Sequence, residues 1–450
     1  MSHYKPYPAY KESGVEWIGR VPEHWSAKPI KIIASCNDDS LPESLSADTP
    51  IRYVDISSVS HDEGIAVAEP ILFGDAPSRA RRKAQAGDVV VSTVRTYLKA
   101  VASVDEAHAD CVYSTGFAVL RPRKEHLALG FLKWLALNEL LIQAVESHSE
   151  GLSYPAINAS ELINLKTVVP NLCEQVRIAS VLDRETARIN ALITKKTRFI
   201  ELLKEKRHAL IDHAVTKGLN SETPIRNSGV EWLGEIPAHW LVAQLGKISI
   251  ARCDGPFGSG LKSEHYQPDG VRVVRLQNIG WASFKDGNEA FISHQHWQDV
   301  LGCGHEVLPN DVLIGGLGDD KNPLGRACVA PSNLGPAMVK ADCYRFRLNT
   351  SRANPDFIAL ALSATARAEC GYLATGATRD RLNLGLASAR VVPLPPLNEQ
   401  AEIVASLNRD TARIDLLTEK TQRSIDLLKE RRAAFITAAV TGQIDLRESA

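Results

Sequence analysis

The sequence predicts an α+β protein in which two mixed α/β globular domains are joined by two long antiparallel coiled-coil helices, with an internal pseudo-two-fold repeat. Three observations support this fold class. The length of 450 residues corresponds to two to four domains of ordinary size. A short motif and a longer segment each occur twice. Both copies of the longer segment have the heptad pattern of apolar residues that is typical of a coiled coil.

The first repeat is an entry motif at the start of each half of the chain. SGVEWIGRVPEHW (13–25) and SGVEWLGEIPAHW (228–240) share nine of thirteen residues at an offset of 215. We expect the tryptophan, proline and histidine residues of both motifs to pack the entrance of a domain rather than to bind a ligand. Both copies retain their apolar residues, which favours a packing role.

The second repeat has an offset of 225. Its matched pairs are Glu174-Gln175 with Glu399-Gln400, the TARI segments at 186–189 and 411–414, and LLKEKR at 202–207 with LLKERR at 427–432. The two halves diverge between these matched segments. Because solenoid units have only 20–50 residues, repeats this long indicate two copies of a domain-plus-helix unit.

The matched segments predict two helices of about 40 residues, each roughly 60 Å long. No proline interrupts residues 175–217, and Gly218 follows at the position where a helix would stop. Asn171 and Asn398 are the predicted N-caps. The alternative is a pair of amphipathic surface helices, but the equal registers in the two copies favour pairing with each other. The predicted coiled-coil seam consists of Leu182, Ile189, Leu203, Leu210, Leu407, Ile414, Leu428 and Phe435.

The domain boundaries follow from these segments. We expect a first globular domain at 1–173, a central spacer helix at 174–219, a second domain at 220–397, a distal spacer helix at 398–442 and a tail at 443–450. Both globular domains contain a turn followed by a β-rich run, then short strands, then helical stretches. The halves therefore share a fold but differ in surface residues, which suits two specificities in one chain.

Composition excludes several classes of protein. The 52 Lys and Arg residues balance 53 Asp and Glu, which argues against a uniformly basic nucleic-acid coat and against an acidic disordered tail protein. No apolar run is long enough to predict a membrane span, and the polar N-terminus does not resemble a secretory signal. The eight cysteines form no CxxC pair, which indicates reduced thiols and a cytoplasmic protein.

Motifs for catalysis are weak. The segment GPFGSGLKS at 255–263 resembles a phosphate-binding loop, but Leu261 separates its last glycine from the lysine. The triplet at 319–321 resembles a nuclease motif without an upstream acidic partner, and the Cys-Gly-His segment at 303–305 offers only two of the ligands that a metal site needs. We therefore expect a non-catalytic chain with no catalytic residues, no metal and no cofactor of its own.

Local charge and two aligned loops indicate nucleic-acid contact. Residues 37–75 have a net charge of −8 and residues 79–99 a net charge of +5, although clustered charge can also be a solvated face. The loops 151–158 and 376–383 align at the offset of 225 with different tips. Arginine can recognise guanine and asparagine adenine. The candidate DNA-binding residues are Arg79, Arg81, Arg82, Lys83, Arg95, Tyr97, Lys99, Tyr154 and Asn158, and in the second half Lys262, Ser263, Arg275, Asn278, Lys321, Arg326, Arg379, Arg381 and Asn383.

The sequence resembles the specificity (S) subunits of type I restriction–modification systems over nearly its whole length. The resemblance lies in the GVEW[IL]Gx[VI]PxHW entries, the TARI helices, the segment at 255–262, and the junctions Val168-Val169-Pro170…Glu174-Gln175 and Val391-Val392-Pro393…Glu399-Gln400. It implies two target-recognition domains, each recognising one half of a bipartite site on double-stranded DNA, with the two helices as the spacer between them.

The resemblance also implies the partners of the chain. Two modification subunits would methylate adenine using S-adenosylmethionine, and a restriction or translocase subunit using ATP and Mg²⁺ would be a further partner. All catalysis would then reside in these partners. Two alternatives remain open from the sequence: a coiled-coil scaffold that tethers protein partners without binding DNA, and a fused methyltransferase or nuclease.

Overall fold

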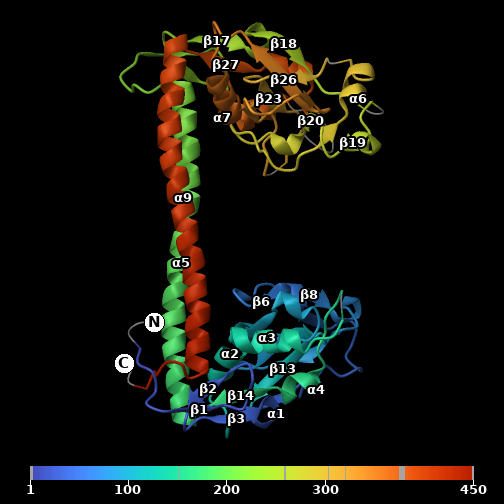
Figure 1. Ribbon diagram of the computed structural model, residues 1–450, viewed down its shortest axis with the longest axis vertical. Helices are drawn as coiled ribbons and strands as arrows, with labels where there is room; N and C mark the ends of the chain where they lie inside the picture. Colours follow the sequence, from blue (N-terminus) through green and yellow to red (C-terminus); the bar gives the residue numbers. More distant parts are fainter. Residues whose placement is uncertain are drawn as a thin grey trace. The chain divides into compact units, whose positions relative to one another are not determined.

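The structure is a computed structural model that describes residues 4–151, 153–257, 260–302, 304–319, 321–373 and 381–447. The chain divides into two compact units: unit 1 comprises residues 1–197 and 422–450, and unit 2 comprises residues 198–421. Each unit contains one globular domain and part of each long helix (Figure 1). The predicted fold class, two mixed α/β domains with two long paired helices, is confirmed.

The globular part of unit 1 is built on two four-stranded sheets with the orders β11-β10-β13-β4 and β8-β5-β12-β9. Strands β5 and β12 run parallel, and the other neighbours are antiparallel. The strands are β4 (Ala34–Cys36), β5 (Pro50–Val54), β8 (Glu69–Leu72), β9 (Ala80–Lys83), β10 (Val89–Ser92), β11 (Val101–Ser103), β12 (Val112–Ser114) and β13 (Phe117–Pro122).

Unit 2 repeats this topology. Its sheets have the orders β18-β26-β23-β24 and β19-β21-β20-β25-β22, and the single parallel pair recurs as β20 with β25. Apart from β19, which adds an edge strand to the second sheet of unit 2, the strand orders are equivalent, so the two domains are copies of one fold. The strands are β18 (Ser249–Cys253), β19 (Tyr266–Gln267), β20 (Val271–Val274), β21 (Phe291–Ile292), β22 (Glu306–Val307), β23 (Val312–Gly315), β24 (Ala327–Val329), β25 (Ala337–Val339) and β26 (Cys343–Leu348).

An aspartate precedes the central strand of each domain. Asp88, before β10, and Asp311, before β23, each accept a backbone hydrogen bond at 2.8 Å that closes the preceding turn. Each buried carboxylate also pairs with an arginine of the neighbouring strand, Arg121 at 2.9 Å and Arg347 at 2.9 Å. The repeated turn-and-strand segment of the sequence is therefore a structural anchor, because a buried charge needs such a partner.

The short helices of the two units differ, and one polar position accounts for the difference. Unit 1 has α2 (Phe131–Ala136) and α3 (Glu139–Ser147), whereas unit 2 has the single helix α7 (Pro355–Leu373). Asn138 caps α3 by accepting a hydrogen bond from the Leu140 amide, and so separates α3 from α2. Its counterpart Ser363 bonds instead to the backbone of Ala327, and α7 continues. The other short helices are α1 (Ile30–Ile33), α4 (Ala159–Asn164), α6 (His294–Asp299) and α8 (Leu384–Ala389).

Two-stranded ladders complete each domain and correct one alignment. The register of β14 with β3 places Val169 opposite Ser26, and that of β27 with β17 places Leu394 opposite Leu241. Pro170 is therefore equivalent to Pro395, and the expected match of Val168-Val169-Pro170 with Val391-Val392-Pro393 is wrong by two residues. The ladders are β1 (Tyr10–Glu12) with β2 (Arg20–Pro22), β3 (Ser26–Pro29) with β14 (Lys166–Val169), β6 (Val59–Ser60) with β7 (Gly64–Ile65), β15 (Ile225–Asn227) with β16 (Glu235–Pro237), and β17 (Leu241–Gln244) with β27 (Val391–Leu394).

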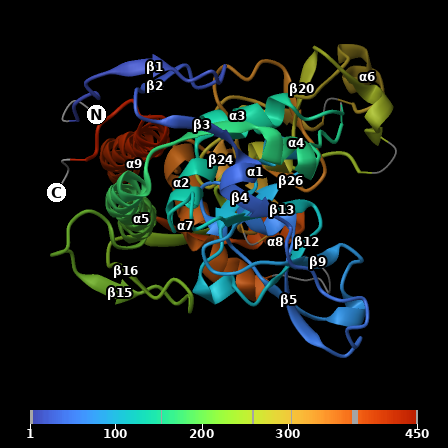
Figure 2. The same cartoon turned by 90° about the horizontal axis from the view of Figure 1, so that it is seen from below.

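The two long helices are α5 (Leu172–Lys217) and α9 (Leu397–Val440). In unit 1, residues 178–182 share a core with residues 435–440, and in unit 2 residues 211–215 share a core with residues 403–407. The helices are therefore antiparallel within each unit, and Figure 2 shows them side by side.

Most of the predicted seam is confirmed. The buried seam residues are Leu182, Ile189, Leu203, Leu407, Ile414 and Phe435. Leu210 and Leu428 are only half-buried, and Ile211 and Ile425 take the inner positions next to them. A strict seven-residue register drifts by about 20° per heptad on a straight helix, which accounts for the change of position.

The helix starts confirm one predicted cap and overturn the other. The Asn171 side chain accepts a hydrogen bond from the Glu174 amide at 3.0 Å, as an N-cap should. Asn398 lies inside the first turn of α9, so its prediction as a cap was wrong. The offset of 225 makes Pro396 the counterpart of Asn171, and its carbonyl accepts from the Gln400 amide at 3.0 Å.

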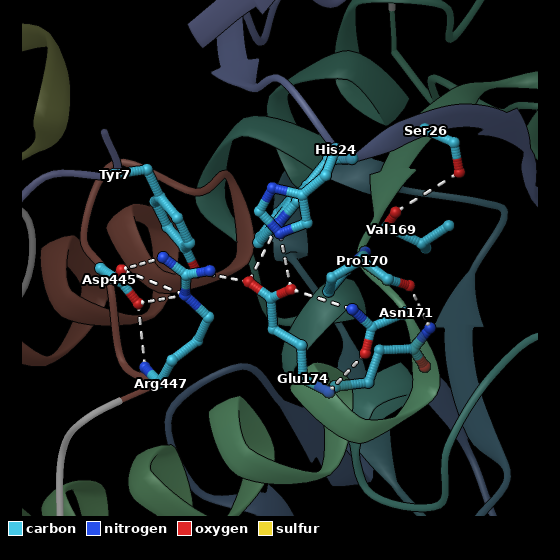
Figure 3. A network of polar contacts seen from close by, with 11 residues as sticks. Tyr7, His24, Ser26, Val169, Pro170, Asn171, Glu174, Asp445 and Arg447 are labelled. Carbon is cyan, nitrogen blue, oxygen red and sulfur yellow. Dashed lines mark hydrogen bonds and ion pairs between the residues drawn. The ribbon is translucent and has the colours of Figure 1, made fainter. Parts of the chain in front are cut away.

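The repeated Glu-Gln pair fastens each helix to its domain. In unit 1 the buried Glu174 carboxylate accepts hydrogen bonds from Tyr7 Oη at 2.7 Å and Trp25 Nε1 at 3.1 Å, and lies 2.8 Å from His24 Nε2 (Figure 3). Burial and the Glu174 carboxylate raise the pKa of Tyr7 above its ordinary value, so its hydroxyl stays a donor.

The same junction recurs in unit 2. Glu399 accepts from Trp240 Nε1 at 3.0 Å and lies 2.8 Å from His239 Nε2. Gln175 and Gln400 each bond, through their side-chain amides, to three backbone groups in equivalent places. The entry motifs therefore pack the junctions, as expected, and both Trp25 and Trp240 are fully buried.

The two ends of the chain meet at the junction of unit 1. The Asp445 amide donates to the Lys5 carbonyl at 2.8 Å. Arg447 pairs with Asp445 and lies over the ring of Tyr7 at 5.0 Å (Figure 3). In unit 2 one continuous segment that follows Gly218 connects the end of α5 to the entry motif. The C-terminal tail therefore completes the junction of unit 1.

Candidate nucleic-acid interface

In unit 1 two loops meet beside the end of the central strand β10. The Ile157 amide donates to the Thr93 carbonyl at 2.9 Å, and a β-bridge joins Val94 to Ala156. We name residues 93–99 and 153–158 edge 1. These backbone bonds hold the two loops together independently of their side chains.

Unit 2 has the same arrangement beside β23. The Leu382 amide donates to the Gly316 carbonyl at 3.0 Å, and a β-bridge joins Leu317 to Arg381. We name residues 254–257, 316–319 and 381–383 edge 2. The alignment of Ala156 with Arg381 in the sequence is thus an equivalence of position in the two domains. The framework is shared and the exposed side chains differ.

Edge 1 contains five of the candidate residues, which are Arg95, Tyr97, Lys99, Tyr154 and Asn158. The Arg95 guanidinium lies over the ring of Tyr154 at 5.0 Å, and both Tyr97 and Tyr154 are exposed. Arg95 and Lys99 both have left-handed backbone conformations, with φ of 50° each. Lys99 Nζ lies 3.1 Å from a Glu139 carboxylate oxygen. An arginine stacked on an exposed aromatic ring offers a base both a stacking surface and hydrogen-bond donors.

The other basic residues of the first half lie on or beside β9. Arg79 pairs with Asp55 at 3.0 Å, and its hydrogen bond to the Tyr53 hydroxyl, together with the Asp55 charge, raises the pKa of its guanidinium. Arg81 lies over a phenylalanine ring at 4.8 Å. Lys83 is exposed, while Arg82 has a buried Nε with no hydrogen-bond partner in the described part of the chain. The basic cluster expected at residues 79–99 is thus divided between β9 and edge 1. Asp55, from the acidic stretch at 37–75, neutralises the charge of Arg79.

Edge 2 holds an arginine in a defined orientation. Arg381 donates through Nε to one Asp342 carboxylate oxygen at 2.9 Å, and its Nη2 lies 2.7 Å from the same oxygen in an ion pair. Its guanidinium also lies over the exposed ring of Phe257 at 5.6 Å. The Asp342 carboxylate raises the pKa of Arg381 above its ordinary value.

A second carboxyl group lies close to this pair. Asp254 Oδ1 accepts hydrogen bonds from the Gly255 amide at 2.7 Å and the Asp342 amide at 3.1 Å. Burial, reinforced by the Asp342 charge, raises the pKa of Asp254 to about 6.

Replacing Asp254 with asparagine is expected to remove a pH dependence of stability. Because its folded pKa of about 6 exceeds the unfolded value of about 4, the folded state binds the proton more tightly. The stabilisation from this proton is complete below the unfolded pKa and lost as the pH rises through the folded pKa. Asparagine keeps an oxygen acceptor and carries no charge. Urea unfolding should therefore show the variant more stable than the natural chain at pH 7, with a gap that shrinks toward pH 4; a gap independent of pH would contradict this.

The remaining candidates of the second half differ in exposure. Lys262, Ser263 and Lys321 are exposed, and Lys262 Nζ lies 3.6 Å from a Glu264 carboxylate oxygen. Arg275 is half-buried and donates to the Asn288 carbonyl at 2.6 Å. The exposed residues Lys262, Ser263 and Lys321 remain candidates for phosphate contact.

Two of the candidate DNA-binding residues are buried and cannot contact DNA directly. Asn278 is 1% exposed, and its side chain bonds to the backbone of Arg275, Lys285 and Gly287. Arg326 is 4% exposed and donates to four backbone carbonyls, and burial lowers the pKa of its guanidinium. The expectation that these two contact DNA is corrected: both stabilise loops of the domain. The sequence could not distinguish a DNA-binding role from a structural role, because asparagine and arginine serve in both.

Two other candidates cap helices. Asn158 forms a capping box with Glu161 at the start of α4, and Asn383 accepts from the Leu386 amide at the start of α8. Their match at the offset of 225 therefore has a structural explanation, and the side-chain oxygen of Asn383 is occupied.

Several predicted features lie outside the described residues. These are Arg379, with the tip of its loop, and parts of the segments at 255–263, 303–305 and 319–321. Within the described part of the chain, no group of three or more His, Cys, Asp and Glu residues is placed to hold a metal ion. No helix found there is long and apolar enough to cross a membrane.

Sequence reasoning missed two residues of edge 2, Phe257 and Asp254, and the partner of Arg381, Asp342. Asp342 is 39 residues from Arg381 in the chain, so no local pattern links them. A usable signal was present for Phe257, since an aromatic residue inside a glycine-rich segment is unusual for a phosphate-binding loop. The structure also places a cavity of about 430 Å³ beside residues 317–319, lined in part by Gln277 and Lys285.

Comparison with known proteins agrees with this arrangement. Residues 70–202, which include edge 1, match the type I restriction modification DNA specificity domain. A putative type I restriction enzyme MjaX specificity subunit from Methanocaldococcus jannaschii is 24% identical over 97% of this chain and 98% of its own length. The chain is thus similar to type I specificity subunits over nearly its whole length.

Further type I specificity subunits are similar to this chain in sequence or in fold. The MjaVIII specificity subunit of the same archaeon is 23% identical over 67% of this chain and 68% of its own. The HsdS subunit from Thermoanaerobacter tengcongensis has a TM-score of 0.51 at 22% identity, covering 94% of this chain and 98% of that subunit. A chain solved in a study of the complex assembly and conformational transition of the type I R-M system has a TM-score of 0.73 at 21% identity, covering 94% and 99%. The alternative of a scaffold that does not bind DNA is not favoured by these similarities.

Proposed function

We propose that this chain is the DNA specificity subunit of a type I restriction–modification complex, in which each unit recognises one half of a bipartite site. The observation that supports this most directly is the equivalence of edges 1 and 2. Two copies of one framework present different exposed side chains, which two different half-sites would require. Exposed cations would position each domain on phosphates, and the edges would contact base edges in the groove.

The chain would direct chemistry that its partners perform. In this proposal two modification subunits bind S-adenosylmethionine and methylate adenine, and a restriction subunit with ATP and Mg²⁺ joins them for cleavage. This chain contributes binding and orientation only, and acts in the cytoplasm on double-stranded DNA.

Equivalent exposed leucines on the paired helices support two identical partners. In unit 1, Leu192 and Leu427 are exposed close to the contact between Asn190 and Arg432, whose atoms are 2.7 Å apart. Apolar residues on a helix surface are typical of a docking site for another chain.

Unit 2 repeats this surface with Leu417 and Leu202, close to the pair of Asp415 with Arg207 at 3.2 Å. Both leucines are exact counterparts of those in unit 1 at the offset of 225. Two equivalent surfaces on one chain would bind two copies of one partner, which is the stoichiometry proposed for the modification subunits.

Lengthening the spacer should change the gap of the DNA target. We expect that seven residues inserted after Thr197 in α5, with seven inserted after Thr421 in α9 to keep the pairing, add about 10 Å of helix. The unread gap between half-sites should grow by about three base pairs, and neither half-site should change. Sequencing of methylated bases in cells expressing the complex measures both quantities.

A matched control replaces seven residues of each helix at the same places without changing its length. An altered gap in this control, an unaltered gap in the lengthened variant, or a change within a half-site would each count against the spacer role. Absence of any methylated motif with the natural chain would overturn the proposed function itself.

A further inference from the structure

The backbone on both sides of the Arg381 side chain is held in place. Leu382 is fully buried, its amide donates to the Gly316 carbonyl at 3.0 Å, and its carbonyl accepts from the Tyr344 hydroxyl. The bridge to Leu317 fixes Arg381 itself against the loop after β23. Because the backbone of this exposed arginine is fixed, less conformational entropy is lost when its side chain binds a ligand.

The Arg381 guanidinium group is contacted by Asp342 along one edge and by Phe257 on one face. Nε donates to Asp342 Oδ1, Nη2 lies 2.7 Å from the same oxygen, and the ring of Phe257 lies against the flat surface at 5.6 Å. The opposite edge, formed by Nη1 and the second hydrogen of Nη2, makes no hydrogen bond to the described residues. Two parallel N–H groups therefore remain available on an exposed edge.

This free edge matches the major-groove edge of guanine. Guanine presents two adjacent acceptors, O6 and N7, whereas adenine presents one acceptor beside an amino donor that would oppose the guanidinium. The pairing needs a planar fork in a fixed orientation, which the carboxylate and the aromatic ring supply here.

The local charge argues against a role for Arg381 as a phosphate clamp. Asp342 neutralises the guanidinium, and the Asp254 carboxyl group lies next to this pair. A neutral pair beside a second acid attracts phosphate weakly, and phosphate contact depends on net positive charge. Hydrogen-bond matching with a base edge does not require net charge.

We infer that Arg381 is a specificity-determining residue that recognises a guanine in one half-site, with Asp342 as its positioning residue. The inference rests on the proposed function and deepens it. It predicts which base is recognised by edge 2, and it separates this arginine from cations such as Lys262 that would contact only phosphate.

The test uses the full-length chain together with its modification subunits and a pool of randomised duplex DNA. Bound DNA is sequenced for the natural chain and for Arg381→Ala and Arg381→Lys. We expect both variants to lose preference for guanine at one position of one half-site by roughly 5- to 150-fold, with the other half-site unchanged. The slope of affinity against salt concentration should stay close to that of the natural complex, since a neutral pair is involved.

Each result decides between the alternatives. An unchanged motif in both variants, a lysine variant that keeps the full guanine preference, or a uniform loss of affinity with a flatter salt slope would overturn the inference. If the natural complex enriches no motif, the proposed function fails instead, so the two failures are distinguishable. Arg409→Ala, which removes an exposed arginine on α9, is the control and should leave the motif unchanged.

Asp342→Asn tests the positioning role separately. Asp342 has a left-handed backbone with φ of 63°, which asparagine tolerates well, so this variant keeps the fold. Loss of the carboxylate should reduce discrimination at the same base position as Arg381→Ala and at no other. Equal loss at several positions would show a general structural effect and would overturn the assignment.

Discussion

Replacing Glu369 with alanine is expected to lower the free energy of unfolding by about 3–5 kcal/mol, because it leaves the Arg390 charge buried without a counter-charge. Both side chains are almost completely buried, and Arg390 Nε lies 2.7 Å from Glu369 Oε2. The remaining guanidinium donors bond to the carbonyls of Leu362 and Gly325. Urea denaturation of the purified chain measures the loss, and a change below 1 kcal/mol would contradict it.

The repeat supplies the control for this prediction. At the offset of 225, Ala144 and Leu165 stand in unit 1 where Glu369 and Arg390 stand in unit 2. The double variant Glu369→Ala with Arg390→Leu should therefore recover most of the lost stability, because an apolar pair already occupies this position in the same fold. Recovery will be incomplete, since the Val391 amide loses its 2.7 Å hydrogen bond to Glu369. A double variant as unstable as Glu369→Ala would show that the buried charge is not the cause.

Replacing Leu192 and Leu427 with glutamate should remove one of the two modification subunits from the complex. Both leucines are exposed on the helix pair of unit 1, and glutamate maintains helix propensity, so the chain should still fold. Each buried leucine contributes about 1.5–3 kcal/mol to an apolar contact, so losing both should weaken that contact at least about 100-fold. The mass of the complex, measured by light scattering after size-exclusion chromatography, should fall by one modification subunit.

The equivalent surface of unit 2 provides a matched test of this prediction. Leu417→Glu with Leu202→Glu should remove the other copy, and all four substitutions should remove both. Lys195→Glu, an exposed polar position on the same helix as Leu192, should leave the stoichiometry at two. Full occupancy with all four substitutions would show that the modification subunits bind elsewhere.

The sequence predicted the long helices well because their information is local and periodic. Heptads, the absence of proline and a terminal glycine are sufficient to place α5 and α9. The error at Asn398 arose from residue type alone, since asparagine is a common cap but Pro396 is the residue equivalent to Asn171. The register of β27 against β17, which only strand pairing determines, corrected the nearby alignment.

The recognition edges were predicted only in part. The aligned loops correctly marked Ala156 and Arg381 as equivalent positions of one framework. Residue type could not separate the exposed Arg381 from the buried Arg326, because burial depends on contacts made by distant strands. Asp342, which orients Arg381, is separated from it by helix α7 and had no local signal.

The sequence by itself determined that this chain is a duplicated domain-plus-helix protein that resembles type I specificity subunits. Repetition and periodicity are properties of residue order, so they need no structure to be recognised. Only the tertiary structure decided which polar residues face a ligand and which stabilise the fold. Asn278 and Arg326 were assigned to the framework, and the free edge of Arg381 was defined by Asp342 and Phe257. The physical reason is that the role of a polar side chain depends on its partners, and folding brings those partners from distant parts of the chain.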